Sequence, residues 1–72
     1  MLDMKTQKKI RDTINDSDSG HVESLRQEAF KALTRLKQVD SSKGLTALER
    51  NEVDVNVEII TRAEAKLYGR EA

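Results

Sequence analysis

The only histidine of the chain, His21, directly follows a run of small polar residues at positions 16–20, Asp-Ser-Asp-Ser-Gly. Serine, histidine and aspartate together are the set that nucleophilic hydrolysis uses, with histidine as the general base. Neighbours in sequence at a turn rarely point at one another, and this chemistry also needs an oxyanion hole. We therefore interpret His21 as a solvent-facing residue in a first helical turn. The sequence predicts no catalytic residues and no enzyme activity.

The same run also carries oxygen-bearing side chains at alternate positions, as calcium-binding loops do. The EF-hand loop needs an oxygen ligand at position 5, glycine at 6 and glutamate at 12. Counted from Asp16, those positions hold Gly20, His21 and Gln27, so the pattern fails. The chain has no cysteine for a thiolate zinc site and no glycine-rich phosphate loop. The sequence therefore predicts no metal site and no cofactor.

Basic residues gather near the N-terminus, at Lys5, Lys8, Lys9 and Arg11. Four basic residues over two helical turns are able to contact the phosphate backbone of a nucleic acid. The formal net charge is zero, from 13 basic and 13 acidic residues, which argues against a general nucleic-acid-binding protein. No aromatic residues lie among these bases to stack on nucleobases. A solvated helix face is the simpler interpretation, and nucleic-acid binding is the alternative.

Composition limits the chain to one small domain, residues 1–72. Folding at this size removes only roughly 60% of the unfolded chain's surface from water. Apolar residues make up 36% of the chain, and Phe30 and Tyr68 are its only aromatic residues. The core is therefore thin and has no disulfide to reinforce it, so we expect a homodimer. No apolar run resembles a membrane span or a signal peptide, so we expect a cytoplasmic protein.

The clearest periodicity lies in residues 22–39, where apolar side chains recur at spacings of three and four. This is the seam of a helix that packs against other helices. We predict a helix at about 20–39 with Asp18 or Ser19 as its N-cap, followed by a break at 40–44. We also predict a short helix at about 3–16, which is marginal alone and must dock. The seam consists of Val22, Leu25, Ala29, Ala32, Leu36 and Val39, and Phe30 and Leu33 widen it.

The last segment, about 46–69, has two interpretations. Thr46 and Glu49 form a capping box at the start of a helix. In that helix Val53, Val57 and Ile60 extend the apolar side beyond half of the circumference, so it needs burial against both its own chain and a partner. The alternative is a strand at 53–60, because apolar residues also alternate there. No second strand is available for pairing, so we favour the long helix.

These patterns predict an all-α fold, in which a short N-terminal helix accompanies a helical hairpin and two hairpins pair as a dimeric helical bundle. The alternative is an α+β fold with a strand at 53–60. The residues expected in the core or the dimer interface are Val22, Leu25, Ala29, Phe30, Leu33, Leu36, Leu48, Val55, Ile59, Ala63 and Leu67.

Function is expected to depend on binding, because the chain lacks a catalytic set. We expect a small non-enzymatic regulator, adaptor or inhibitor, of the kind that phages and plasmids carry, that binds another protein through a helical surface. Val53, Val57 and Ile60 are its expected partner surface. The alternative is a dimeric DNA-binding transcriptional regulator that uses the basic N-terminal helix.

Overall fold

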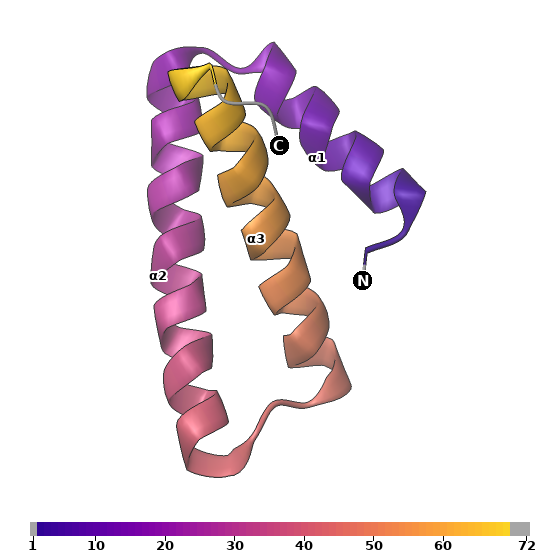
Figure 1. The fold of residues 1–72 in the computed structure, drawn as a ribbon, viewed down its shortest axis with the longest axis vertical. Helices are drawn as coiled ribbons and strands as arrows, with labels where there is room; N and C mark the ends of the chain where they lie inside the picture. Colours follow the sequence, from indigo (N-terminus) through magenta and orange to yellow (C-terminus); the bar gives the residue numbers. More distant parts are fainter. Residues whose placement is uncertain (1, 70–72) are drawn as a thin grey trace.

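The protein consists of three helices in a computed structural model that describes residues 2–69. Helix α1 spans Met4–Asp16, α2 spans Ser19–Lys43 and α3 spans Ala47–Tyr68. Helices α2 and α3 form an antiparallel hairpin, and α1 lies beside the C-terminal half of α3 (Figure 1). No strand occurs within residues 2–69. The all-α prediction is confirmed, and the strand alternative at 53–60 is wrong.

The helix starts follow the predicted capping chemistry. The side chain of Asp18 accepts a hydrogen bond from the backbone N–H of His21 at 2.8 Å, as an N-cap does. At α3, the Thr46 hydroxyl accepts from the N–H of Glu49 at 3.1 Å, and the Glu49 carboxylate accepts from the N–H of Thr46 at 3.0 Å. The predicted capping box is confirmed.

Helix α2 is longer than predicted, because residues 40–43 continue it instead of breaking it. These residues are exposed and small or charged, so only weak helix propensity opposes their extension. The helix ends at Gly44, whose N–H donates to the carbonyl of Asp40 at 3.1 Å and whose φ is +79°. Side-chain-bearing residues rarely adopt that φ, so glycine ends the helix there.

The apolar residues that alternate along 53–60 also fit a helix that is buried on two sides. Val53, Val57 and Ile60 follow one another at spacings of four and three, which places them on one side of α3. Val55 and Ile59 lie at a spacing of four on another side. A strand here has no neighbouring strand in the described chain, whereas a helix satisfies its backbone internally.

The core lies where all three helices meet. Ile14, Val22 and Ala63 are buried there, and Ile10, Leu25, Ile59 and Leu67 pack around them. Further along the hairpin only Ala29 and Leu36 are buried. Of the other residues predicted in the core or dimer interface, Leu25, Leu33, Val55, Ile59 and Leu67 are half-buried.

Phe30 and Leu48 do not belong to the core of the single chain, since they are 45% and 72% exposed. Leu48 lies in the first turn of α3, at the end of the hairpin that α1 does not reach (Figure 1). Phe30 lies at the edge of the α2 apolar stripe. Leu25 lies at the opposite edge of this stripe, and that edge faces α1. Phe30 is therefore not covered by a third helix.

The C-terminus of α1 is held by a side chain from α3. The last turn of α1 contains no basic residue of its own. Lys66 donates from its Nζ to the carbonyls of Ile14 at 2.8 Å and Asn15 at 2.7 Å, and also to the carbonyl of Ser17. A cation at a helix C-terminus compensates the free carbonyls and the helix dipole. Lys66 therefore fastens α1 to the hairpin.

Candidate functional site

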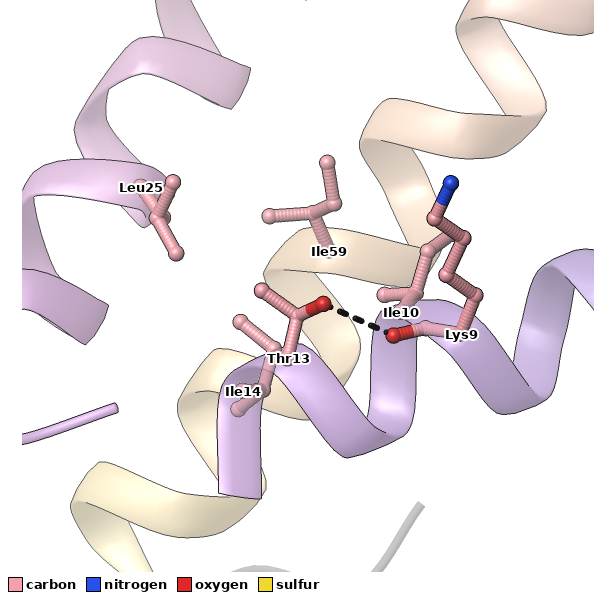
Figure 2. A pocket seen from close by; sticks show the side chains of 6 residues that line it. All are labelled: Lys9, Ile10, Thr13, Ile14, Leu25 and Ile59. Carbon is pink, nitrogen blue, oxygen red and sulfur yellow. Dashed lines mark hydrogen bonds between the residues drawn. The ribbon is translucent and has the colours of Figure 1, made fainter. Parts of the chain in front are cut away.

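One side of the helical hairpin has no helix packed on it. Leu25 and Ile59 face α1 (Figure 2). At about 100° per residue, Phe30 lies about 140° round α2 from Leu25, and Val57 lies about 160° round α3 from Ile59. We call this side the uncovered hairpin face, defined by Arg26, Phe30, Leu33, Val53, Val57, Ile60 and Tyr68.

Apolar side chains on the uncovered hairpin face are accessible to solvent. Phe30, Val57 and Tyr68 are 45%, 48% and 56% exposed. Leu33, Val53 and Ile60 are half-buried on the same face. Single exposed apolar residues are ordinary on a protein surface, whereas a contiguous group marks an interaction site. Both aromatic residues of the chain belong to this group.

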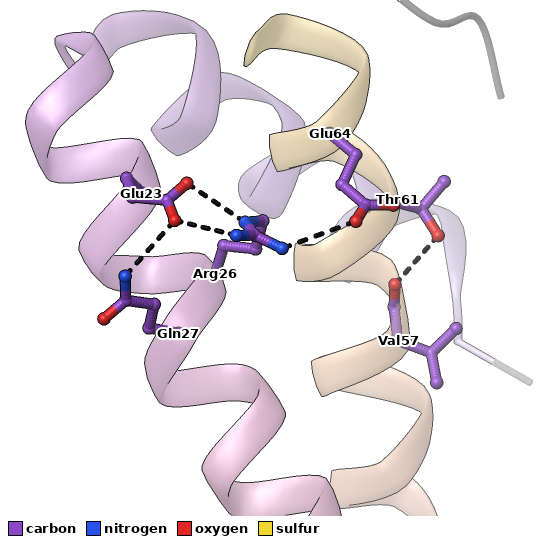
Figure 3. A network of polar contacts seen from close by, with 6 residues as sticks. All are labelled: Glu23, Arg26, Gln27, Val57, Thr61 and Glu64. Atoms are coloured by element: carbon purple, nitrogen blue, oxygen red, sulfur yellow. Dashed lines mark hydrogen bonds and ion pairs between the residues drawn. The ribbon is translucent and has the colours of Figure 1, made fainter. Parts of the chain in front are cut away.

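At one end of the uncovered hairpin face, Arg26 lies between Glu23 of α2 and Glu64 of α3 (Figure 3). Its guanidinium donates two hydrogen bonds to Glu23, at 3.0 and 2.7 Å, and lies 3.5 Å from the Glu64 carboxylate. The hydrogen bond to Arg26 lowers the pKa of the Glu23 carboxyl. The guanidinium also lies 5.3 Å from the ring centroid of Phe30 and 5.8 Å from that of Tyr68. Arg26 is therefore charge-compensated and braced against both rings.

The predicted partner surface, Val53, Val57 and Ile60, is brought together on the uncovered hairpin face. Sequence reasoning assigned Phe30 to the core or dimer interface and gave Tyr68 no role. A signal for Tyr68 exists, because it lies eleven residues after Val57 and so close to the same side of α3. The pairing of Arg26 with both rings joins two helices and has no local sequence signal.

An apolar pocket lies between α1 and the hairpin (Figure 2). Its volume is about 170 Å³, and its lining residues are Lys9, Ile10, Thr13, Ile14, Leu25 and Ile59. The one hydroxyl in this lining, on Thr13, donates to the carbonyl of Lys9 at 2.9 Å. The pocket lining is therefore largely apolar, and an apolar group is what the pocket would accept.

Helix α1 places the predicted basic residues on two different surfaces. Lys5, Lys8 and Arg11 line a groove of about 360 Å³ together with Arg62 from α3. Lys9 instead borders the apolar pocket. Sequence reasoning missed Arg62, because it lies more than fifty residues away and joins the others only through the packing of α1 on α3.

Acidic residues temper the charge of this basic groove. The Nε of Arg11 lies 3.7 Å from the Asp12 carboxylate, and the Nε of Arg62 lies 3.6 Å from the Glu58 carboxylate. The buried Nε of Arg62 makes no hydrogen bond. The groove therefore offers a cationic surface suited to an anion, with part of its charge already neutralised.

The residues around His21 serve as helix caps and turn residues. His21 itself is exposed, and its N–H is bonded to the Asp18 carboxylate. The Ser17 hydroxyl donates to the carbonyl of Thr13 at 2.7 Å. Among residues 2–69, no group of three or more histidine, cysteine, aspartate or glutamate side chains is placed to hold a metal ion. No helix in that part of the chain is both long and apolar enough to cross a membrane.

Three surfaces are thus candidates for function: the uncovered hairpin face, the apolar pocket and the basic groove. The uncovered hairpin face carries three of the exposed large apolar residues, Phe30, Val57 and Tyr68, and two of these are the aromatic residues of the chain. The pocket is an extension of the core, since Ile10, Ile14, Leu25 and Ile59 belong to both. In comparisons with known proteins, the chain matches no family model, no curated protein and no solved structure.

Proposed function

We propose that this protein is a small non-enzymatic binding module, a regulator, adaptor or inhibitor that packs its uncovered hairpin face against another polypeptide. The observation that carries the proposal is the exposure of Phe30 and Tyr68 next to the charge-compensated Arg26. Tyrosine and arginine are enriched among the residues that dominate binding energy at interfaces. The proposal places the protein in the cytoplasm, in keeping with its lack of cysteine.

Burial of this face supplies a driving force of useful size. Complete burial of a large apolar side chain contributes about 1.5–3 kcal/mol. Phe30, Val57 and Tyr68 are each close to half exposed, so each has about 1 kcal/mol still to gain from a partner. Because the rings are braced by Arg26, little side-chain freedom remains to be lost on binding.

The test compares charged substitutions on and off the face. Val57→Arg alters the uncovered hairpin face, and Leu48→Arg is the control because Leu48 is 72% exposed in the same helix but off that face. Tagged proteins are used to capture polypeptides from a host lysate supplemented with an untagged copy, after nuclease treatment. We expect the wild type and Leu48→Arg to retain one stoichiometric polypeptide that Val57→Arg loses. Equal capture by all three proteins would contradict the proposal.

A second candidate function is nucleic-acid binding, favoured by the joining of Arg62 to Lys5, Lys8 and Arg11 around one groove. Four phosphate contacts on duplex DNA would give a slope of about −3.6 in a plot of log affinity against log salt. Arg62→Gln should make that slope shallower by about 0.9. Lys31→Gln on α2 is the control, and affinity without salt dependence would exclude this candidate.

A further inference from the structure

We propose that the occupant of the uncovered hairpin face is a second copy of this chain. Two hairpins would stack face to face as a four-helix bundle, with one α1 on each outer side. The inference rests on the proposed function, because it names the partner of the same face. Three observations support it: the apolar centre of the face, the charges at its two ends and its size.

The centre of the face is apolar on both helices. The ion pair between Arg26 and Glu64, at 3.5 Å, sets the register of the antiparallel hairpin. In that register, Phe30 is level with Ile60, and Leu33 is level with Val57. Phe30, Leu33 and Ile60 occupy the middle of the face, with charged residues beyond them. Val57 lies level with them at the outer border of the face, where it also lines a shallow pocket with Leu2 and Gln7. An apolar centre with a polar rim is the usual anatomy of a protein interface.

The two ends of the face carry opposite charges. At one end Glu23 and Glu64 share the single cation Arg26. At the other end lie Lys37, eleven residues after Arg26, and Arg50, fourteen residues before Glu64, and both are exposed. Glu49, eleven residues before Ile60, lies at the same end, so its net charge is positive by one. Spacings of 11 and 14 residues return to nearly the same side of a helix. The face is therefore net acidic at one end and net basic at the other.

A second copy complements this charge pattern in one symmetric arrangement. A two-fold axis in the interface plane, perpendicular to the helices, stacks α2 on α2 and α3 on α3 with their directions reversed. The acidic end of each copy then lies over the basic end of the other. Two-fold dimers use the same patch on both partners, so the patch must complement itself. This face does, in both its apolar centre and its charges.

The size of the face suits a dimer. The 22 residues of α3 extend about 33 Å, and two adjacent helices are about 20 Å wide, which gives about 650 Å² on each copy. Standard interfaces bury about 800 Å² on each partner. The chain also has surface to lose, because it exposes 5334 Å² where a monomer of 8.2 kDa is expected to expose about 4500 Å².

The thin core adds to the need for a partner. Within residues 2–69 only Ile14, Val22, Ala29, Leu36 and Ala63 are buried, and two of these are alanines. Small chains of this kind commonly gain stability by oligomerisation.

The first test is the mass of the full chain in solution by sedimentation equilibrium. We expect the wild type to sediment at twice 8.2 kDa at high micromolar concentration. Val57→Arg and Phe30→Ala should each raise the dimer dissociation constant, Val57→Arg by about 100-fold, with helix content unchanged by circular dichroism. Leu48→Arg should leave it unchanged. A dimer that survives both face substitutions would overturn the proposal.

A cross-linking test locates the contact. The chain has no cysteine, so a single introduced cysteine reports only contacts between copies. Val57→Cys should be linked into a covalent dimer by a short bis-maleimide. The more exposed Leu48→Cys should not be linked at the same concentration. Linking of Leu48→Cys in preference to Val57→Cys would overturn the proposed face.

The outcomes separate this inference from the proposed function. A wild-type protein that is monomeric at high micromolar concentration overturns the second copy as partner. If Val57→Arg still loses a captured polypeptide that Leu48→Arg retains, the face binds a different protein and the proposed function stands. If neither substitution affects capture, both proposals fail.

Discussion

The two ends of the hairpin differ in how many helices surround them. At one end, α1 joins the start of α2 and the end of α3, where Ile14, Val22 and Ala63 are buried and Lys66 fastens α1 in place. At the other end only two helices meet, and Leu48 is 72% exposed. We call these the three-helix end and the two-helix end.

The difference shows that helical periodicity alone does not decide burial. Both ends carry apolar residues at helical spacing, yet a side chain is buried only where a third layer covers it. Two helices enclose only the line of contact between them, and the flanking positions stay open to solvent. The uncovered hairpin face therefore depends on a partner, whereas the core of the three-helix end is complete within one chain.

Substitution in the core of the three-helix end should destabilise the protein most. Ile14→Ala should lower the free energy of unfolding by about 3 kcal/mol, because Ile14 is 2% exposed and its loss leaves a cavity. Leu48→Ala at the two-helix end should cost less than about 0.5 kcal/mol. Urea unfolding of both variants measures the difference. Similar losses would show that the two ends are equally well packed.

The next effect concerns the turn that closes the two-helix end. Gly44 has a φ of +79° and no atom within 4 Å of an added Cβ, so Gly44→Ala adds backbone strain alone. We expect a loss of about 1–3 kcal/mol in the free energy of unfolding. Gly20→Ala is the matched control, since its Cβ would make an ordinary 3.6 Å contact with Asp18 inside a helix. Gly20→Ala should raise the free energy of unfolding by about 0.5–1 kcal/mol. If Gly20→Ala lowered the free energy of unfolding as much as Gly44→Ala does, backbone strain at Gly44 would not explain the effect.

A smaller and local effect is expected at the three-helix end from Lys66→Met. This substitution removes the cation that caps α1 and keeps most of the side chain's length. The lost bonds to the carbonyls of Ile14, Asn15 and Ser17 should cost about 1 kcal/mol, so amide exchange in α1 should speed up about fivefold. Lys31→Met on α2 should leave α1 unchanged. Uniform acceleration in all three helices would show that α1 is not separately fastened.

The smallest expected effect is a pH dependence at the two-helix end. The backbone N–H of Thr46 donates to the Glu49 carboxylate and holds its pKa below the ordinary 4.5. A lowered folded-state pKa stabilises the protein above the unfolded-state pKa, and this stability is lost as the pH falls through the folded-state value. Thermal unfolding from about pH 7 to about pH 3 should show this acid loss in the wild type and less of it in Glu49→Gln. Identical profiles would exclude the contribution.

Local features could be predicted from the sequence. The caps at Asp18 and at Thr46 with Glu49 involve residues no more than three apart, so the chain's order alone brings them together. The helical character of 53–60 was also predictable, because no partner strand existed. The extension of α2 through residues 40–43 was missed because turn-forming residues on an exposed surface oppose a helix only weakly.

Features that depend on the position of α1 could not be predicted. Periodicity places Phe30 at one edge of the α2 stripe, but the docking of α1 decides which edge is covered. The same docking separates Lys9 from Lys5, Lys8 and Arg11. The contact of Lys66 with the end of α1 joins residues about fifty positions apart, beyond any local pattern.

The most direct test of the central claim is amide hydrogen exchange measured at several protein concentrations. If a second copy covers the uncovered hairpin face, protection in the parts of α2 and α3 that form this face increases with concentration, while protection of α1 changes little. Such a result would show that the face is completed by a second copy. Protection that is independent of concentration throughout the hairpin, in protein at concentrations well above micromolar, would contradict the claim.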